Sequence, residues 1–381
     1  MKEKILPQSI IGDSSSHAST QCSPVPIDNQ NKNLNEKFQD TLDYFSKIEN
    51  MNEFLSKTYP KFHENLELLS YINHGSMGIV FEGKLKKAHF QPKLAIKFKF
   101  DKKPKKEKKE SQEVTILKKL HHNNIIEIYS QVNMNECSQF SVLESAKYGD
   151  LIHFQEEILK RKVMSETMLN YFTYQILEGL SYMHKCKVVH MDIKHGNILV
   201  NSNLNIKIID FSISCLYNDF HPLDLVKFPR VGTSKYMSPE ILGGVNMKAK
   251  EACKIDLYSL GVTLYFSAIG SYPYNIDNIE NKQYDQILNS IKTNKLEFPE
   301  KPKLSPMFKD FLSKLLEKDY RKRFNIVQAL NHPWMKGTII ISEEKENTNC
   351  IENFLINLVT DKIMKFNEYL KNTPFLGNTK K

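Results

Sequence analysis

The residue types best suited to catalysis or metal binding gather in one short polar segment, residues 189–200. Asp192, Lys194 and Asn197 lie there between apolar runs. Asp192 precedes Asn197 by so few positions that no packed helix or strand can separate them, and we expect both on one loop. A carboxylate and an amide on the same loop are suited to a hard cation.

Two short strands are expected to position this loop. Residues 198–200 predict one strand, and the alternation at 205–209 predicts a second. The Asn and Ser residues at 201–203 predict the turn between them, because such side chains bond to nearby backbone. The second strand ends at Asp210, so a hairpin would return Asp210 to the side of Asn197 and Asp192. The pattern predicts a cation site there, with Asp192 left to face a substrate.

The same residues resemble a known family. His190-x-Asp192-Ile193-Lys194-x-x-Asn197, followed by Asp210-Phe211-Ser212, resembles the catalytic loop and magnesium motif of eukaryotic protein kinases. Lys194, two residues after Asp192, resembles the serine/threonine branch. The resemblance implies an enzyme that transfers the γ-phosphoryl group of ATP, with Mg²⁺, to Ser or Thr hydroxyls of protein substrates. A pseudokinase scaffold that binds nucleotide without turnover is the alternative.

The resemblance implies an α+β fold with two lobes. It covers about residues 66–337, with a small β-rich N-lobe with one key helix (about 66–144) and a larger, mainly helical C-lobe (about 148–337). We expect residues 1–65 to form a flanking segment, disordered at first and then containing one amphipathic helix. Residues 338–381 form a tail with one further helix. Residues 273–334 resemble, more loosely, kinases of the calcium/calmodulin-dependent type.

The N-lobe motifs imply a nucleotide site. The turn at 73–78 resembles the glycine-rich loop, where glycines let backbone amides approach phosphate oxygens, although Asn73 replaces the first glycine. Leu94-Ala95-Ile96-Lys97 resembles the strand whose lysine holds phosphates. Glu113, on a helix expected at 110–120, matches that lysine's partner.

Residues 140–150 resemble the hinge between the lobes. The backbone of Glu144 and Ala146 would bind adenine, Leu143 would be the gatekeeper, and Asp150 would meet the ribose. The full ATP-binding set that the resemblance implies is Ile72, Asn73, Gly75, Gly78, Val80, Ala95, Lys97, Glu113, Glu144, Ala146, Asp150 and Leu199.

Phosphoryl transfer depends mostly on positioning and charge neutralisation. By the resemblance, Asn197 and Asp210 bind Mg²⁺. Asp192 orients the substrate hydroxyl and accepts its proton, and Lys194 neutralises charge on the transferred group. Met191 stands where the family has an arginine that binds an activation-segment phosphate, so we expect activity without that phosphate. Ser212 replaces the glycine after Asp210-Phe211, which makes backbone flipping there harder.

Further C-lobe motifs fit the same family. An amphipathic helix is expected at 168–186, and an apolar helix begins at Asp256. Residues 232–240 match the end of the family's activation segment, with Ser238 for alanine. Arg323 is the expected buried partner of Glu240.

Composition bounds the remaining properties. The net charge is +9, of which six lysines and one glutamate at 102–109 contribute +5, so overall charge does not favour specific nucleic-acid binding. That lysine run is expected to be a solvated loop, with a nuclear-localisation signal or an acidic partner's site as the alternative. The six scattered cysteines indicate reduced thiols of an intracellular protein, and we expect the cytoplasm as its compartment. No apolar run is long enough to span a membrane, and no signal peptide is expected.

The flanking segments are amphipathic. Apolar residues from Leu34 to Leu55 recur at helical spacing, as do those from Ile351 to Leu370. The first stripe predicts a helix packed on the neighbouring domain, or one that docks a partner or dimerises. The second predicts packing on the large lobe, or an autoinhibitory or partner-binding tail.

Overall fold

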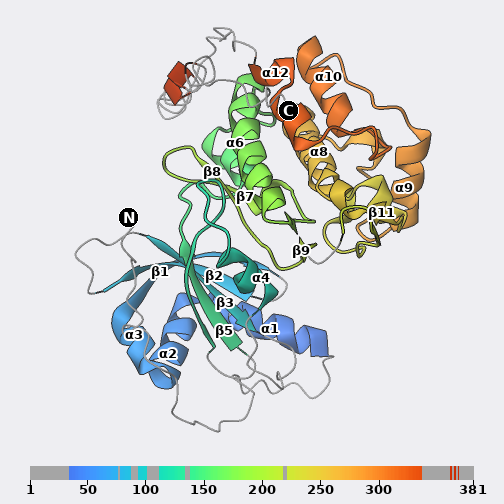
Figure 1. Cartoon of the computed structure of the whole chain (residues 1–381). Helices are drawn as coiled ribbons and strands as arrows, with labels where there is room; N and C mark the ends of the chain where they lie inside the picture. The colour runs from blue at the N-terminus through green and yellow to red at the C-terminus, as the bar shows by residue number, and fades with distance from the viewer. Residues whose placement is uncertain are drawn as a thin grey trace, which may run out of the picture. The chain divides into compact units, whose positions relative to one another are not determined.

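The computed structural model describes residues 34–75, 78–86, 93–100, 111–133, 138–217 and 221–336, with five positions between 361 and 368. The chain divides into two compact units (Figure 1). The first comprises Met1–His121 with Ile126–Ala146, and the second comprises His122–Ile125 with Lys147–Lys381. A β-sheet dominates the first unit and helices dominate the second, which confirms the predicted α+β class.

The first unit is built on one antiparallel sheet of five strands in the order β1-β2-β3-β5-β4. Alternating burial along β3 divides its side chains between the two faces of the sheet. Its strands are β1 (Leu66–Gly75), β2 (Gly78–Leu85), β3 (Leu94–Phe100), β4 (Ile128–Asn133) and β5 (Ser138–Glu144).

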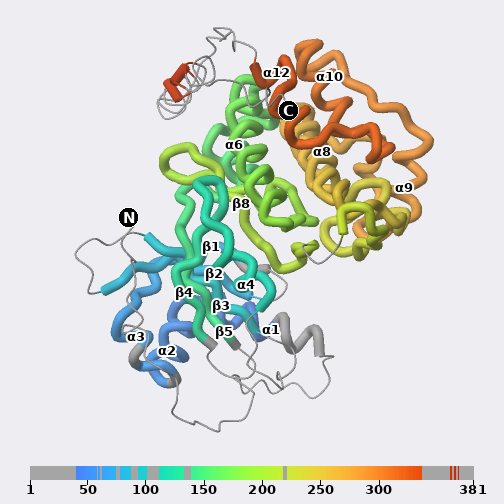
Figure 2. The backbone as a smooth tube through the Cα atoms, viewed as in Figure 1, coloured from blue at the N-terminus to red at the C-terminus, as the bar shows by residue number. Residues whose placement is uncertain are grey.

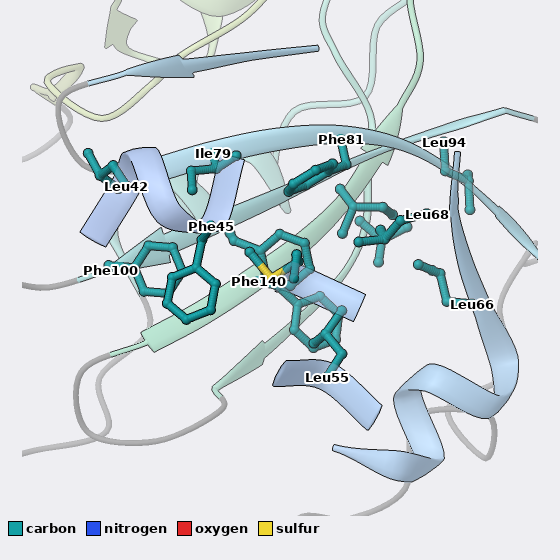
Figure 3. Close-up of a cluster of buried hydrophobic side chains, with 14 of the residues drawn as sticks. Leu42, Phe45, Leu55, Leu66, Leu68, Ile79, Phe81, Leu94, Phe100 and Phe140 are labelled. Atoms are coloured by element: carbon teal, nitrogen blue, oxygen red, sulfur yellow. The ribbon is translucent and has the colours of Figure 1, made fainter. Parts of the chain in front are cut away.

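One face of this sheet is covered by three helices that precede it, α1 (Leu34–Ser46), α2 (Ile48–Thr58) and α3 (Pro60–Asn65). Phe45 on α1 stacks on Phe100 of β3 with ring centroids 5.6 Å apart. Figure 3 shows these side chains in one apolar cluster with residues of the sheet. The cluster contains Leu42, Phe45, Met51, Leu55, Leu66, Leu68, Ile79, Phe81, Leu85, Leu94, Ile96, Phe98, Phe100, Phe140 and Val142.

Where the sequence predicted one amphipathic helix, the structure has three short ones. Lys47 takes extended backbone angles and ends the α1 direction. Tyr59 precedes Pro60, and the residue before a proline is disfavoured in helical geometry, so α3 starts anew with proline in its first turn. The apolar stripe still packs on the neighbouring sheet, as the first of the two interpretations expected.

Truncating Phe45 tests how much this three-helix layer stabilises the first unit. Phe45→Ala is expected to lower the free energy of unfolding by about 3–5 kcal/mol, because it removes a fully buried ring and leaves a cavity. Tyr44→Ala is the matched control, since Tyr44 is 42% exposed on the same helix. Urea unfolding of both variants measures the difference. Equal losses would show that the layer is only loosely attached.

The second unit is built around two long helices, α6 (Glu166–Lys185) and α8 (Lys254–Ile269). Ser165 caps α6, its Oγ accepting from the Met168 N–H at 3.4 Å. Almost every residue of α8 is buried, as its apolar sequence requires. Both helices fit the predicted positions. The shorter helices are α5 (Leu151–His153), α7 (Pro239–Leu242), α9 (Tyr284–Thr293), α10 (Pro306–Leu315), α11 (Ile326–Leu330) and α12 (Pro333–Lys336).

A small hairpin lies against α6 in this unit (Figure 2). β7 (Ile198–Val200) pairs antiparallel with β8 (Ile206–Ile208), which confirms the hairpin expected from the sequence. Gln175 of α6 fixes it in place, its Oε1 accepting from the Ile206 N–H at 3.0 Å. The hairpin therefore stands on a rigid helix.

Three predictions concern residues outside the described ranges. They are the disordered start at 1–33, the lysine run at 102–109 and the apolar stripe of the tail. Among the described residues, no helix is long and apolar enough to cross a membrane.

Candidate active site

The face of the first unit's sheet opposite the apolar cluster holds several predicted ATP-binding side chains. In the strand register, Val80 of β2 pairs with Lys97 of β3, and Ala95 of β3 pairs with Leu143 of β5. Directly paired residues share a face, so these four side chains lie together on the central strands. All four are partly buried, which leaves them accessible to a ligand.

Lys97 forms the ion pair that the sequence predicted. Its Nζ lies 2.7 Å from Glu113 Oε1 on α4 (Gln112–Leu117). Glu113 is buried, and Ser111 caps its helix, so the carboxylate is held in position. The helix is shorter than the predicted 110–120. The N–H groups of Lys119 and Leu120 donate to carbonyls three residues earlier, which is the 3₁₀ pattern and not the α-helical one.

The glycine turn is shorter than the predicted 73–78, because β1 continues through Asn73 to Gly75 and β2 begins at Gly78. Gly75 pairs with Gly78, and the two residues between them lie outside the described ranges. A side chain at Gly78 would place its Cβ 2.4 Å from the Phe98 carbonyl oxygen, so packing on β3 by itself requires glycine. Asn73 lies in the β1 ladder opposite Val80, after a bulge, and Ile72 is 48% exposed.

The hinge residues are held by backbone contacts. The Glu144 N–H donates to the Glu127 carbonyl at 2.9 Å in the first unit, where Ala146 also lies. In the second unit Asp150 caps α5, its Oδ1 accepting from the His153 N–H at 2.9 Å, and it bridges to Leu199 of β7. Asp150 therefore has a local structural role beside the predicted one.

Asp192 lies at the centre of the polar loop in the second unit. Its Oδ1 accepts from the Thr233 N–H at 2.8 Å. Its Oδ2 accepts from Asn197 Nδ2 at 2.9 Å and lies 2.7 Å from Lys194 Nζ. A carboxylate offers about four acceptor sites, so three donors fix its orientation and leave room for one more.

The activation segment reaches this carboxylate through Gly232 and Thr233. Gly232 has φ of +106°, and a Cβ there would lie 3.0 Å from Asp192 Oδ1, so only glycine fits. Thr233 Oγ1 accepts from Lys194 Nζ at 2.5 Å. The segment and the loop are thus locked together by hydrogen bonds on either side of Asp192.

Asp256, at the start of α8, holds the polar loop by its backbone. It is fully buried and accepts from the N–H groups of His190 and Met191, each at 2.9 Å. His184 Nε2 lies 2.9 Å from the same carboxylate. Met191 has φ of +73°, a costly conformation for this residue, and the bonds to Asp256 hold it there.

Asn197 and Asp210 meet at the base of the hairpin. The Ile209 N–H donates to the Asn197 carbonyl at 3.0 Å, next to Asp210. Asn197 Nδ2 donates to both the backbone oxygen and Oδ2 of Asp192, at 2.8 and 2.9 Å. The amide nitrogen is therefore engaged, and the amide oxygen is the atom that can serve as a ligand.

Magnesium fits this donor set. Within the described ranges, no group of three or more His, Cys, Asp or Glu residues gathers as a metal cage. Mg²⁺ does not need one, because it usually takes one or two carboxylates and completes its shell with water and substrate phosphates. One amide oxygen and one carboxylate suit that mode of binding.

The predicted pair of Arg323 and Glu240 is confirmed. Two parallel hydrogen bonds of 2.7 and 3.0 Å join the guanidinium to the carboxylate, and both side chains are buried. Arg323 Nε also donates to the Glu317 carbonyl at 2.9 Å. The pair fixes the end of the activation segment to the helical unit.

Comparison with known proteins agrees with this arrangement. The family description "Protein kinase domain" matches residues 66–335. The chain belongs to the protein kinase family. It is 32% identical over 227 residues to testis-specific serine/threonine-protein kinase 1 of Mus musculus, covering 59% of each chain.

Two further relatives of this kinase are similar over longer stretches. Calcium-dependent protein kinase 4 of Plasmodium berghei is 32% identical over 308 residues, 78% of this chain and 53% of the relative. The calcium/calmodulin-dependent protein kinase kinase of Caenorhabditis elegans is 32% identical over 244 residues, 63% and 43%. This chain covers less than two thirds of the length of all three.

Sequence reasoning missed two supports of the kinase loop. Asp256 was recognised only as the start of an apolar helix. A carboxylate within so apolar a sequence is expected to be buried and therefore to need hydrogen-bond partners. His195 was not singled out at all. It is 1% exposed, with Nδ1 3.0 Å from the Tyr236 hydroxyl and Nε2 2.8 Å from Ser267 Oγ.

His195 should make the stability of this kinase depend on pH. Burial lowers the pKa of His195 from 6.5 to about 4, and a hydrogen bond with the backbone of Thr263 offsets part of this by raising the pKa. The unfolded chain therefore takes up a proton near pH 6.5 and the folded chain does not. The stabilisation is complete above that pH and is lost as pH falls toward the folded value, by about 2 kcal/mol between pH 7 and pH 5.

Urea unfolding at the two pH values measures this loss, and His195→Gln is the comparison because glutamine does not titrate. The pH-dependent difference between wild type and variant isolates His195 from the other histidines. Identical pH dependence in the two proteins would contradict the assignment.

Proposed function

We propose that this chain is a serine/threonine protein kinase that transfers the γ-phosphoryl group of ATP to Ser or Thr hydroxyls of proteins. The observation that carries the proposal is the set of contacts around Asp192, which fixes a carboxylate and leaves one acceptor position open. The names of the three relatives, all protein kinases, support the same activity. We also propose residues 66–337 as the catalytic domain, with lobes of about 66–144 and 148–337, and the cytoplasm as its compartment.

The ion pair of Lys97 and Glu113 places an ammonium group where it can bind the nucleotide. An ammonium group on a partly buried strand face needs an anion, and Glu113 holds it extended from the strand. In this proposal Lys97 binds the α- and β-phosphates of ATP, and Glu113 keeps it in place. In the same proposal Val80 and Ala95 contact the adenine ring, and the backbone of Glu144 and Ala146 bonds to it.

Asn197 and Asp210 are the proposed magnesium ligands. The amide oxygen of Asn197 is left for the ion because its nitrogen is engaged by Asp192. When bound, Mg²⁺ neutralises phosphate charge and orients the group to be transferred. Loss of Asn197 should raise the magnesium concentration that activity needs, and loss of Asp210 should abolish activity.

Asp192 and Lys194 act on the substrate in this proposal. The remaining acceptor position of Asp192 receives the substrate hydroxyl, which orients its oxygen and gives its proton a destination. Lys194 lies between Asp192 and Thr233, where its charge offsets the negative charge of the transferred group. Neither residue needs to move to reach the other.

A labelled-ATP transfer assay on a generic protein substrate, run with and without magnesium, tests the proposal. Label should enter Ser and Thr only when magnesium is present, and Asp210→Asn should abolish it. Nucleotide binding without any transfer by the wild type would favour a scaffold instead.

Phosphatase treatment should leave most of the activity. Met191 cannot clasp a phosphate, and the activation segment is pinned by other contacts. β6 (Val188–Val189) pairs with β9 (Cys215–Leu216), and the Tyr217 N–H donates to the Lys187 carbonyl at 3.0 Å. We expect a loss below about two-fold, since no phosphate-dependent ion pair is removed.

Mass spectrometry verifies that the phosphate was removed before the rates are compared. Near-complete loss of activity that rephosphorylation restores would contradict this expectation and would point to a phosphate receptor formed without Met191.

A further inference from the structure

Two cationic side chains lie side by side on the activation segment. Lys227 and Arg230 are both exposed. Each packs over Gly244, where the position of a Cβ would be 3.4 Å from Arg230 Nη2 and 3.5 Å from Lys227 Cε. Gly244 has φ of +62°, a conformation that favours glycine, so no side chain separates its backbone from Lys227 and Arg230.

The two cations border a hollow in the surface. The hollow has a volume of about 570 Å³ and is lined by Lys227, Phe228, Pro229 and Arg230. Phe228 is only 2% exposed, so its ring anchors the segment between the two cations. The buried Phe228 therefore fixes the backbone between Lys227 and Arg230, while both of these residues stay exposed.

Within the described residues 221–251, each of the three acidic side chains has a partner of its own. Glu240 binds Arg323, Glu251 binds Lys254, and Asp224 accepts from the His221 N–H at 2.8 Å. In the part of the chain that the structure describes, neither Lys227 nor Arg230 has an ion pair. Two adjacent like charges, neither of them in an ion pair with a described residue, attract an anion from outside.

The site is close to the reacting group. Gly232 touches Asp192, and Arg230 precedes Gly232 by two residues, so their Cα atoms are at most about 7 Å apart. A peptide bound in extended form rises about 3.3 Å per residue. A side chain within about four residues of the phosphorylated hydroxyl can therefore reach the guanidinium.

The exposed apolar residues of the same segment favour a peptide over a small ion. β10 (Leu225–Val226) pairs with β11 (Met247–Lys248) beside the cations. Leu223 and Leu225 are 54% and 67% exposed there. A protein segment with acidic and apolar residues would contact both kinds of side chain.

We propose that Lys227 and Arg230 form a substrate subsite for an anionic side chain near the phosphorylated Ser or Thr. The inference rests on the proposed kinase function and narrows its substrates to acidic segments of proteins. The anion is either the carboxylate of Asp or Glu or a phosphate already present on the substrate. Arg230 can bind either in bidentate form, and Lys227 adds a point charge.

Three synthetic peptides with one Ser each test the subsite, differing only in the flanking residues: glutamates, alanines or lysines. A fourth peptide has phosphoserine in place of one glutamate and distinguishes the two anion sources. We expect the wild type to prefer the glutamate peptide over the alanine peptide by about ten-fold in kcat/KM, and the preference to shrink at high salt. Lys303→Ala, which removes an exposed lysine ahead of α10, is the matched control.

Arg230→Ala should lower the ratio of kcat/KM between the glutamate and alanine peptides from about ten to about two, the remainder being due to Lys227. Arg230→Glu should make the lysine peptide a better substrate than the glutamate peptide. Lys303→Ala should leave the ratio at the wild-type value. Equal use of all peptides by the wild type, or an unchanged ratio in Arg230→Ala, would overturn the subsite while leaving the kinase function intact. Absence of transfer to every peptide and to generic protein substrates would instead contradict the kinase function.

Discussion

Asp192→Asn is expected to lower kcat for phosphoryl transfer by a factor on the order of 10³. Asparagine keeps the shape of the side chain but loses the charge and one acceptor oxygen. In the wild type, Oδ1 faces the Thr233 N–H, and Oδ2 faces Asn197 Nδ2 and Lys194 Nζ. An amide must turn its own NH₂ toward one of these donor groups.

The variant therefore fails in two ways. The substrate hydroxyl loses its acceptor, and a buried donor is left facing another donor, which costs about 1–3 kcal/mol of stability. Steady-state rates with saturating ATP and peptide measure the first effect, and thermal unfolding measures the second. Asp285→Asn, which changes an exposed carboxylate on α9, is the matched control and should keep wild-type turnover. Wild-type turnover in Asp192→Asn would refute the assigned chemistry.

Lys97→Met is expected to have the second-largest effect, a loss of kcat/KM for ATP of at least about 10²-fold. The change removes the ammonium group that lies 2.7 Å from Glu113 Oε1 and leaves a buried carboxylate facing a thioether. Lys99→Met is the matched control, because Lys99 lies two residues further along the same face of β3 and is also partly buried.

A double-mutant cycle separates positioning from direct contact. If Glu113 acts by holding Lys97, then Glu113→Gln should weaken ATP use in the wild type and change little in Lys97→Met. Additive losses would mean that the two residues act independently. Lys97→Met with unchanged use of ATP would exclude Lys97 from the nucleotide site.

Local patterns predicted much of this protein. The hairpin that brings Asp210 to Asn197 follows from turn residues and alternation over a dozen positions, and the structure has it. The pairs of Lys97 with Glu113 and of Arg323 with Glu240 were predicted from the family resemblance alone, because no property of a single residue announces a partner so far along the chain.

Other features depend on contacts that no local pattern contains. Asp256 bonds to His190 and Met191, more than sixty positions away, and only the packing of α8 under the loop brings them together. The N-terminal stripe is divided between α1 and α2 at Lys47, and α3 begins separately after Tyr59; the spacing of the apolar residues does not indicate either break. The roles of the individual site residues remain predictions for the experiments above.

The three-helix layer has a practical consequence. The match to the protein kinase domain begins at Leu66, yet Phe45 and Leu55 lie inside the same hydrophobic core as the strands. A fragment that begins at that boundary would expose a large apolar surface to water and tend to aggregate. Anyone producing the catalytic portion alone should start upstream of Leu34, even though no catalytic motif lies there.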